Sequence, residues 1–493
     1  MSLEPFTNIV AARHTRVLRH PERAQRALLR RILASSRGSA TAKALGISGD
    51  ESFSEFLQLA PRSYSFYAPL VEQTFDGDHL AFGREPIIAF GETSGSLGKP
   101  KLIPHNAASL DSVGRFAKRL LLFQLRDGSH YIPMYTKWLA VSASTRIRLE
   151  RGIRVGFISG LMYQIAQKKR RGFMLPTPAI AAISDWDERI ERSVDEAWDK
   201  RVGTMLGVPA YLMRFLEAAS ARANGKPLGE VWPLLGRVYY SGTSIAPYRE
   251  QMEHMLGRPL RVQGLYTATE GSFGAELDAT SPGAIHLMVD LAVFAFRDVR
   301  EPGSHLVPAW DVKRGHRYEV FVTTQAGLIQ YQIGDVLEVA ETRPLRVRVV
   351  GRTEEEINIA TEKLSLKQAH ATLEQVALRA DLHRDHFMVL VDPLQPRRHL
   401  WIIESSDGLS GAQAAGMIDG ALASINPSYA ALRQGDALLD RPRVVVCGRG
   451  CFDAYIAAGF ATRGQFKFRH FPEAQELARI PGLETFARHL EAI

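Results

Sequence analysis

The sequence has little cysteine. Only Cys447 and Cys451 occur among its 493 residues. A disulfide framework is therefore excluded, and two thiolates alone cannot complete a structural zinc site. We expect reduced thiols and a cytoplasmic protein.

Long apolar runs are also absent. No run approaches the roughly 20 residues that a membrane helix needs, and the N-terminus lacks the apolar core of a signal peptide. We therefore expect no membrane partner. Eight arginines within residues 13–37 could indicate a targeting peptide. However, Ala24, Leu28 and Ile32 recur at helical spacing after Pro21, which favours an amphipathic helix with a basic solvent face.

Charge of either sign is not in large excess. There are 61 Lys and Arg against 53 Asp and Glu, a net charge of +8. This balance suits small anionic ligands and only weakly allows nucleic acid. The arginines are not interleaved with aromatic residues as in a base-stacking surface. A nucleic-acid-binding protein that uses its basic N-terminus is therefore the disfavoured hypothesis, and we expect no nucleic-acid partner.

The chain is long enough for two or three domains. Strands alternate with helices in its first half, which predicts an α/β fold with a mixed and largely parallel sheet. We expect a large domain over residues 1–350 and a small, mobile α+β domain over residues 351–493. A polar, charged run at 350–356 would link them. Expected helices cover residues within 20–60 and residues 107–125, 246–257, 364–379 and 411–424. Expected strands cover residues 86–90, 232–241, 260–266, 388–391, 399–404 and 443–447.

The most informative segment is residues 93–101, a loop rich in Gly and Ser that ends in lysine. It follows an apolar stretch that is typical of a buried strand. Glycines allow close backbone approach, and successive N–H groups in such a turn bind anions. The loop is not a standard nucleotide P-loop, because Gly98-Lys99 is followed by Pro100 instead of Ser or Thr. It could hold a polyphosphate or be a surface turn.

Two further strand ends carry hydroxylic residues. Thr243 and Ser244 follow one strand, and Tyr266, Thr267 and Glu270 lie at the end of another. Tyr266 could stack on a base, and Glu270 could hold magnesium beside a phosphate. The alternatives are ordinary turn chemistry for the first segment, and a buried tyrosine with a helix-capping Thr/Glu pair for the second.

Four isolated polar residues are further candidates. Asp335 follows a strand and a glycine, where it could accept ribose hydroxyls or simply form a turn. Arg352 precedes the expected linker. Lys467 lies between two aromatic residues, where a lysine commonly covers a solvated face. His105 could be a general base, although a structural histidine at a strand end is favoured.

The order of these segments resembles the adenylate-forming enzyme superfamily. A finer resemblance is to the acyl acid–amido synthetases of the Gretchen Hagen family, over roughly residues 20–470. It is carried by residues 95–104, 327–335, 358–363, 451–455 and 465–467. Residue 97 is Leu where a threonine is usual, and Ile329, Gln330 and Gln332 depart from the family's Gly-Leu-Tyr-Arg-Tyr-Arg-Val-Gly-Asp segment.

The resemblance implies ATP and Mg2+ as cofactors. Nucleotide binding would fall on the matching residues Thr93, Ser94, Gly95, Ser96, Thr243, Ser244, Tyr266, Thr267, Asp335 and Arg352. The loop would hold phosphates, Tyr266 would lie against adenine, and Asp335 would hold the ribose. Lys101, Glu270 and Lys467 would be catalytic. Glu270 would bind the magnesium, and Lys467 would move in with the small domain to stabilise charge at the α-phosphate.

The reaction implied is adenylation of a carboxylic acid, followed by transfer of the acyl group to an amine, in particular an amino acid. One alternative keeps the fold but uses coenzyme A as the acceptor. Another is a relative that only binds nucleotide, although retention of Lys101, Glu270, Asp335 and Lys467 disfavours it.

Overall fold

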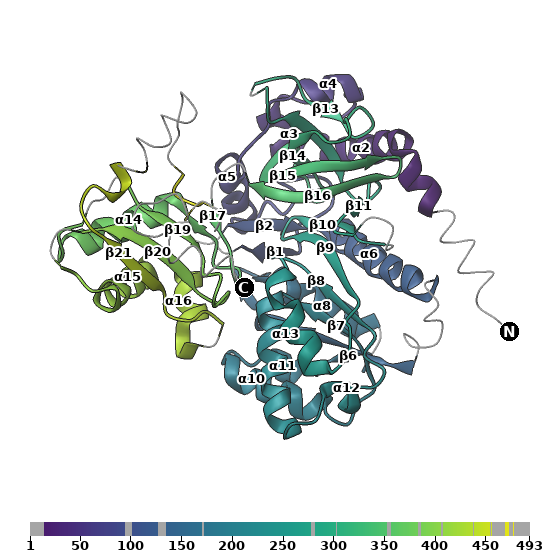
Figure 1. Ribbon diagram of the computed structural model, residues 1–493. Coiled ribbons are helices and arrows are strands. Elements are labelled where there is room, and N and C mark those ends of the chain that lie inside the picture. Colours follow the sequence, from purple (N-terminus) through teal and green to yellow (C-terminus); the bar gives the residue numbers. More distant parts are fainter. Residues whose placement is uncertain are drawn as a thin grey trace. The chain divides into compact units, whose positions relative to one another are not determined.

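The computed structural model describes residues 14–93, 101–126, 135–169, 172–277, 282–301, 303–352, 356–382, 386–405, 408–436, 438–453, 455, 469–472 and 477. They divide into two compact units. The first unit contains the described residues up to 352 apart from 246–248, and the second contains chiefly those from 356 onward (Figure 1). None of the helices among the described residues combines the length and apolar character needed to cross a membrane.

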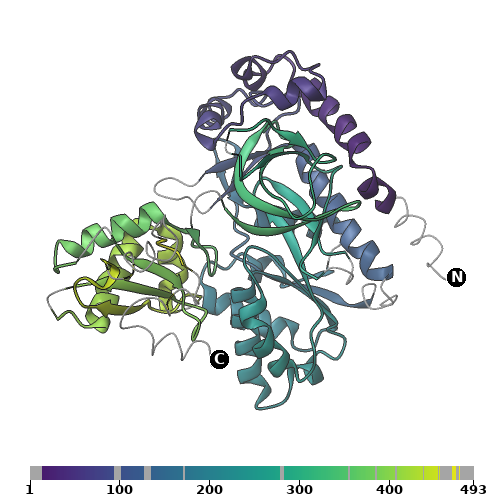
Figure 2. The same cartoon turned by 45° about the horizontal axis from the view of Figure 1, so that its top comes forward.

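One sheet of 12 strands dominates the first unit. In order of pairing its strands are β13 (Val307–Pro308), β12 (Val293–Asp298), β14 (Arg317–Thr323), β15 (Tyr331–Thr342), β16 (Leu345–Arg352), β11 (Ile285–Leu287), β10 (Gly271–Ala275), β9 (Val262–Ala268), β8 (Arg237–Tyr240), β7 (Val202–Gly207), β3 (Lys137–Val141) and β6 (Met174–Leu175). Pairing is antiparallel from β13 to β9 and parallel from β9 to β6. The antiparallel strands curl into an open barrel-like form in Figure 2. The expected mixed sheet is confirmed.

A smaller sheet of the first unit has the strand order β2 (Leu102–His105), β1 (Ala89–Glu92), β5 (Ile153–Phe157) and β4 (Arg148–Glu150). Strands β1 and β2 are antiparallel, so they bring the two ends of the segment between Thr93 and Lys101 together. The amide of Thr93 donates to the carbonyl of Lys101 at 3.0 Å. The two expected strands are thus observed on either side of residues 94–100, which lie outside the described residues.

The helices of the first unit are α2 (Pro21–Ser36), α3 (Ala40–Leu45), α4 (Phe53–Gln58), α5 (Tyr64–Phe75), α6 (Ala107–Arg126), α8 (Ile158–Lys169), α9 (Pro178–Ala181), α10 (Trp186–Ala197), α11 (Pro209–Ala223), α12 (Leu228–Val231) and α13 (Ala246–Leu256). Helix α2 buries Leu28, Leu29, Ile32 and Leu33 against the sheet residues Val293, Ala295 and Phe321. The amphipathic helix expected from its spacing is confirmed. Helices α10 to α13 gather beside the parallel strands (Figure 1).

The second unit is a small α+β unit. Its elements are β17 (Glu356–Ile357), β18 (Leu364–Ser365), α14 (Leu366–Ala377), β19 (Met388–Val391), β20 (His399–Glu404), α15 (Gly411–Ile425), α16 (Pro427–Arg433), a 3-10 turn at Gln434–Asp436 and β21 (Arg443–Cys447). Strand β20 pairs antiparallel with β19 and parallel with β21. Helices α14 and α15 begin with capping boxes at Ser365 and Ser410. In each box the serine hydroxyl accepts the backbone N–H three residues later, and the glutamine at that position accepts the backbone N–H of the serine.

A buried carboxylate organises the start of the second unit. Glu362 is 1% exposed and accepts the amide N–H groups of Ile359 and Ala360 at 2.8 and 2.7 Å. It also contacts Nε2 of buried His399 at 2.9 Å. Burial of a charge is costly unless it is hydrogen-bonded, so these contacts explain why Glu362 folds inward. The segment 358–363 therefore has a structural role in folding this unit.

Several expected boundaries and one interpretation are wrong. Strand β1 begins at Ala89, not at residue 86, and β8 begins only at Arg237 because Pro233 and Gly236 interrupt the apolar run from 232. The expected linker at 350–356 also begins too early. Strand β16 continues to Arg352, because residues up to that position pair with β15. Finally, Thr269 and Glu270 form the turn of the β9–β10 hairpin, so the helix-capping interpretation of this pair is wrong.

Candidate active site

Three of the expected nucleotide-binding residues meet in the first unit. Asp335 on β15 lies opposite Arg352 on β16 in the strand register, and their side chains approach to 3.5 Å between Oδ1 and Nε. The hydroxyl of Tyr266, on β9, donates to Oδ2 of the same carboxylate at 2.7 Å. Arg352 also donates to the carbonyl of Ile333 at 2.5 Å. The carboxylate is thus held from two sides.

Burial and charge fix the protonation of Tyr266. The side chain is 5% exposed and its ring packs against Phe273 at 5.3 Å between centroids. Burial, followed by the adjacent Asp335 carboxylate, raises the pKa of Tyr266 well above its usual value. The phenol therefore keeps its proton at neutral pH and remains a hydrogen-bond donor to Asp335. Its stacking on adenine stays a prediction.

Glu270 lies in the two-residue turn between β9 and β10 and is 9% exposed. Tyr331, on β15, lies near it: burial, and then the charge of Glu270, raises the pKa of the Tyr331 phenol far above its usual value. The charge of Glu270 also helps to raise the pKa of Tyr266. Both Glu270 and Asp335 therefore lie near this tyrosine. Glu270 and Asp335 therefore belong to one cluster, with the Arg352 guanidinium as its positive member.

Gly91 lies directly against the turn that carries Glu270. A Cβ atom on Gly91 of β1 would lie 2.6 Å from Cγ2 of Thr269 and 3.1 Å from Nε2 of His105. Only glycine leaves room for this contact. His105 is 1% exposed, and burial lowers its pKa to about 4. The histidine is neutral at neutral pH and packs beneath the turn, in agreement with the structural role that was favoured.

Lys101 directly precedes β2 and lies near an aromatic ring. Its Nζ lies 6.0 Å from the centroid of Tyr64 on α5, and the Tyr64 hydroxyl accepts the N–H of Leu102 at 2.9 Å. The ring attracts the ammonium group through its negative face. Tyr64 also contributes to the electrostatic environment of Tyr331, so the lysine and the Glu270 cluster share an aromatic neighbour.

Other expected residues lie at neighbouring strand ends. Thr243 and Ser244 follow β8, whose carboxyl end is next to that of β9. The hydroxyl of Thr243 is buried and has no protein partner among the described residues. Thr267 is half-buried on β9 and lies opposite Ser272. Ligands of α/β proteins commonly bind at the carboxyl ends of parallel strands. The positions of Thr243 and Thr267 agree with that rule, and their ligand contacts stay predictions.

Several expected site residues cannot be placed. Ser94, Gly95, Ser96 and Lys467 lie outside the described residues. Conversely, the sequence reasoning assigned no role to Tyr64 or Tyr331. Tyr331 lies inside the family-like segment 327–335, so that segment was the available signal. No sequence signal pointed to Tyr64, because only tertiary packing brings it to Lys101.

The residues fit a magnesium ion that is shared with a phosphate ligand. In the described parts of the chain there is no group of three or more His, Cys, Asp or Glu side chains that could hold a metal. Mg2+ commonly binds through one or two carboxylates together with the phosphates of a substrate. Glu270 offers one such carboxylate next to the cluster that contains Asp335.

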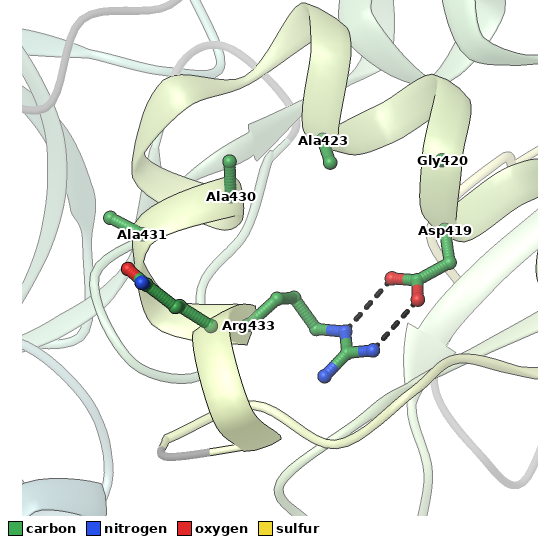
Figure 3. Close-up of a pocket in the computed structure, with 7 residues that line it drawn as sticks. Asp419, Gly420, Ala423, Ala430, Ala431 and Arg433 are labelled. Carbon is green, nitrogen blue, oxygen red and sulfur yellow. Dashed lines mark hydrogen bonds and ion pairs between the residues drawn. The ribbon is translucent and has the colours of Figure 1, made fainter. Parts of the chain in front are cut away.

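The second unit contains a surface pocket of about 440 Å³ (Figure 3). It is lined by Asp419, Gly420, Ala423, Ala430, Ala431, Arg433 and Gln434. Arg433 donates to both oxygens of Asp419, at 2.8 and 2.7 Å. The charges in this pocket are therefore paired with each other, and its other lining residues are three alanines, Gly420 and Gln434. None of the expected nucleotide-binding residues lines it.

Two family models match the chain. The GH3 family N-terminal domain matches residues 11–191, and the GH3 family central domain matches residues 286–352. The second match covers Asp335 and Arg352, and the first covers Thr93 and Lys101.

Curated relatives are plant enzymes. A jasmonoyl–L-amino acid synthetase of Nicotiana attenuata is 21% identical over 385 residues, which cover 64% of this chain and 66% of the relative. A probable indole-3-acetic acid-amido synthetase of Oryza sativa subsp. japonica is 30% identical over 200 residues, 37% of this chain and 32% of the relative. The matched segments thus span just under two thirds of the first relative and about a third of the second.

Solved structures resemble the whole chain. An acyl acid amido synthetase in complex with 2,4-DB has a TM-score of 0.63 and 18% identity, over 98% of this chain and 95% of its own. A 2-hydroxyisobutyryl-CoA ligase in complex with 2-HIB-AMP and CoA has a TM-score of 0.54 and 14% identity, over 100% of this chain and 94% of the ligase chain. These similarities confirm the α/β fold class, with a large N-terminal and a small C-terminal domain.

Proposed function

The chain belongs to the GH3 family, and on that premise we propose that it is an AMP-forming ligase that joins a carboxylic acid to an amino acid. One curated relative is named a jasmonoyl–L-amino acid synthetase, and another a probable indole-3-acetic acid-amido synthetase. The observation that carries the proposal is the cluster of Asp335 on β15, Arg352 at the end of β16, Tyr266 on β9 and Glu270 in the β9–β10 turn. It supplies a paired carboxylate for a ribose and a second carboxylate for a phosphate-bound metal.

The first step is adenylation. A carboxylate oxygen of the acid attacks the α-phosphorus of ATP, the bond from that phosphorus to the bridging oxygen breaks, and pyrophosphate leaves. The protein supplies alignment and charge stabilisation. Asp335 would hold the ribose hydroxyls, Arg352 the ribose or a phosphate, and Lys101 a phosphate. Mg2+, when bound at Glu270, would neutralise phosphate charge.

The second step is amide formation. The neutral amine of the amino acid attacks the acyl carbon, the bond from that carbon to the phosphate oxygen breaks, and AMP leaves while the nitrogen loses a proton. His105 does not suit the role of base, because it is buried beneath the Glu270 turn. We propose that residues 351–493 move between the two steps and bring Lys467 to the α-phosphate. The cytoplasmic location likewise stays a prediction.

The test is a two-stage assay of the full chain. Pyrophosphate exchange with ATP and Mg2+ is measured over a panel of aromatic and aliphatic carboxylic acids. Active acids are then incubated with the twenty amino acids or with coenzyme A, and products are identified by mass spectrometry. We expect an N-acyl amino acid and AMP, without a need for coenzyme A. Stoichiometric acyl-CoA with no amide would establish the ligase alternative instead.

Lys467 is tested in the same exchange assay. Lys467→Ala should fold with an unchanged melting temperature and lose adenylation by roughly a hundredfold, the size expected for one lost stabilising donor. A wild-type exchange rate would remove Lys467 from the mechanism. Lys367→Ala, on the second unit's α14, provides a charge-matched control.

A further inference from the structure

We propose that Glu276 and Tyr240 are specificity-determining residues, which read the base of the bound nucleotide and distinguish adenine from 6-oxopurines. This inference rests on the proposed function, because it takes ATP as a substrate and Asp335 as the acceptor of the ribose hydroxyls. The sequence motifs gave neither residue a role. The inference comes from the convergence of their two polar ends above the backbone of Gly264.

Tyr240, Gly264 and Glu276 form one row across three neighbouring strands. Tyr240 ends β8 and lies opposite Gly264 on β9. Glu276 directly follows β10, and its amide N–H donates to the carbonyl of Gly264 at 2.9 Å. Residues that lie opposite each other in a sheet point their side chains to the same face. The side chains of Tyr240 and Glu276 therefore flank Gly264 on one face of the sheet.

Gly264 leaves the space in which the two side chains meet. A Cβ atom on this residue would lie 3.0 Å from Oε1 of Glu276 and 3.2 Å from the hydroxyl oxygen of Tyr240. Glycine in a strand commonly marks such a close approach. Both polar side chains are half-buried, so a ligand can reach them while part of the solvent is excluded. Hydrogen bonds are stronger in such a place than in open water.

The row lies beside the expected nucleotide site. Tyr266 follows Gly264 by two positions on β9, and side chains alternate along a strand, so both residues face the same side about 7 Å apart. Tyr266 donates to Asp335, the proposed ribose acceptor. At the other end of the row, Tyr240 leads into the turn that contains Thr243. A base attached to a ribose at Asp335 would therefore extend toward Tyr240 and Glu276.

The two side chains match the donors and acceptors of adenine. Burial, followed by the charge of Glu276, raises the pKa of Tyr240 to about 12, so its phenol keeps the proton and can donate. An ionised carboxylate only accepts. Adenine presents an amino donor next to a ring-nitrogen acceptor on its Watson–Crick edge, whereas hypoxanthine presents a carbonyl oxygen and a ring N–H. The carboxylate of Glu276 would face the adenine amino group favourably and the hypoxanthine oxygen unfavourably. A phenol can also accept, so most of the discrimination falls on Glu276.

The experiment measures binding of AMP and IMP to the full chain by calorimetry, without an acid substrate. It is done at mildly alkaline pH, because burial raises the pKa of Glu276. AMP and IMP share the ribose and the phosphate, so the ratio of their dissociation constants isolates the base. We expect the wild type to prefer AMP about 10- to 100-fold, as for hydrogen bonds to a charged group. Glu276→Gln should bring the ratio close to one, because an amide can turn its NH2 group to the hypoxanthine oxygen. Tyr240→Phe should weaken AMP about 2- to 10-fold and IMP less.

Matched controls separate base reading from packing. Glu338→Gln removes a carboxylate of β15 that pairs with Arg317 at 3.2 Å, and Tyr318→Phe removes a buried hydroxyl that accepts from Lys313 at 3.0 Å. Both should keep the wild-type ratio. Equal losses of AMP and IMP affinity in Glu276→Gln, or a wild type without preference between them, would overturn the inference. A wild type that binds neither nucleotide overturns both proposals. If the wild type prefers AMP but forms no adenylate with any acid, base reading stands while the proposed function fails.

Discussion

The hydroxyl of Tyr266 donates a 2.7 Å hydrogen bond to Oδ2 of Asp335, a residue 69 positions away in the sequence. Asp335 also faces Arg352 across a strand pair. This carboxylate therefore meets a neutral donor and a cation, which fix its position, while 14% of its side chain stays exposed. A ribose could add its two hydroxyl donors to a preorganised acceptor at small entropic cost.

Replacement of Asp335 should weaken nucleotide binding. Asp335→Asn keeps the shape but removes the charge, so we expect the dissociation constant for AMP to rise about tenfold to a hundredfold, as for loss of hydrogen bonds to a charged group. AMP lacks the β- and γ-phosphates, so calorimetry with AMP isolates the ribose contacts. Asp440→Asn breaks a comparable pair, with Arg397 at 3.3 Å in the second unit, and should not affect AMP. An unchanged AMP affinity in Asp335→Asn would remove the ribose assignment.

The ring of Tyr64 should matter for Lys101. Tyr64→Leu removes both the aromatic face near the ammonium group and the acceptor for Leu102. We expect pyrophosphate exchange to slow about 5- to 30-fold, corresponding to roughly 1–2 kcal/mol of cation–π interaction. Tyr64→Phe keeps the ring and should slow it less. The idea is wrong if the two variants lose the same activity, because the hydroxyl alone would then explain the effect.

Gly91 should be intolerant of a side chain. Gly91→Ala would place Cβ 2.6 Å from Cγ2 of Thr269 and displace the turn that carries Glu270. Overpacking of this kind costs about 1–3 kcal/mol. We expect a lower melting temperature and weaker Mg2+-dependent ATP binding, both partly restored by Thr269→Ser, which removes the clashing methyl group. Gly236→Ala, where the nearest atom is 3.8 Å away, serves as the control. Normal ATP binding in Gly91→Ala would show that the turn can move without consequence.

His105 should make the protein less stable in mild acid. Burial lowers its pKa to about 4, whereas an unfolded histidine titrates near 6.5. Between these pH values the unfolded chain binds a proton at this histidine and the folded chain does not. The free energy of unfolding therefore falls as pH drops from about 6.5 to about 4, and His105 causes no further change below that pH. The total loss of stability is on the order of 3 kcal/mol.

Thermal unfolding of wild type and His105→Gln should show a difference in melting temperature that shrinks between pH 6.5 and 4. His79→Gln, at an exposed position, should keep the wild-type slope. Parallel pH profiles for wild type and His105→Gln would contradict the prediction.

Local patterns predicted several elements well. The strands 388–391, 399–404 and 443–447 were expected at the bounds that the structure has, because short β-branched runs between polar breaks leave little choice of register. Boundaries failed where pairing partners decide. Arg352 looked like the start of a linker, since its neighbours in sequence are polar. It belongs to β16 because Asp335 lies opposite on β15.

The sequence by itself determined the fold class and the family, because these depend on the order of short motifs, and the candidate nucleotide-binding residues that it offers stay predictions. Only the tertiary structure decided which of them act together. Tyr266, Asp335 and Arg352 come from three strands, and their contacts exist only after the antiparallel sheet closes. The same is true of Tyr64 beside Lys101 and of Tyr331 beside Glu270. Their roles depend on distances between chain segments far apart in the sequence, and no local pattern encodes such distances.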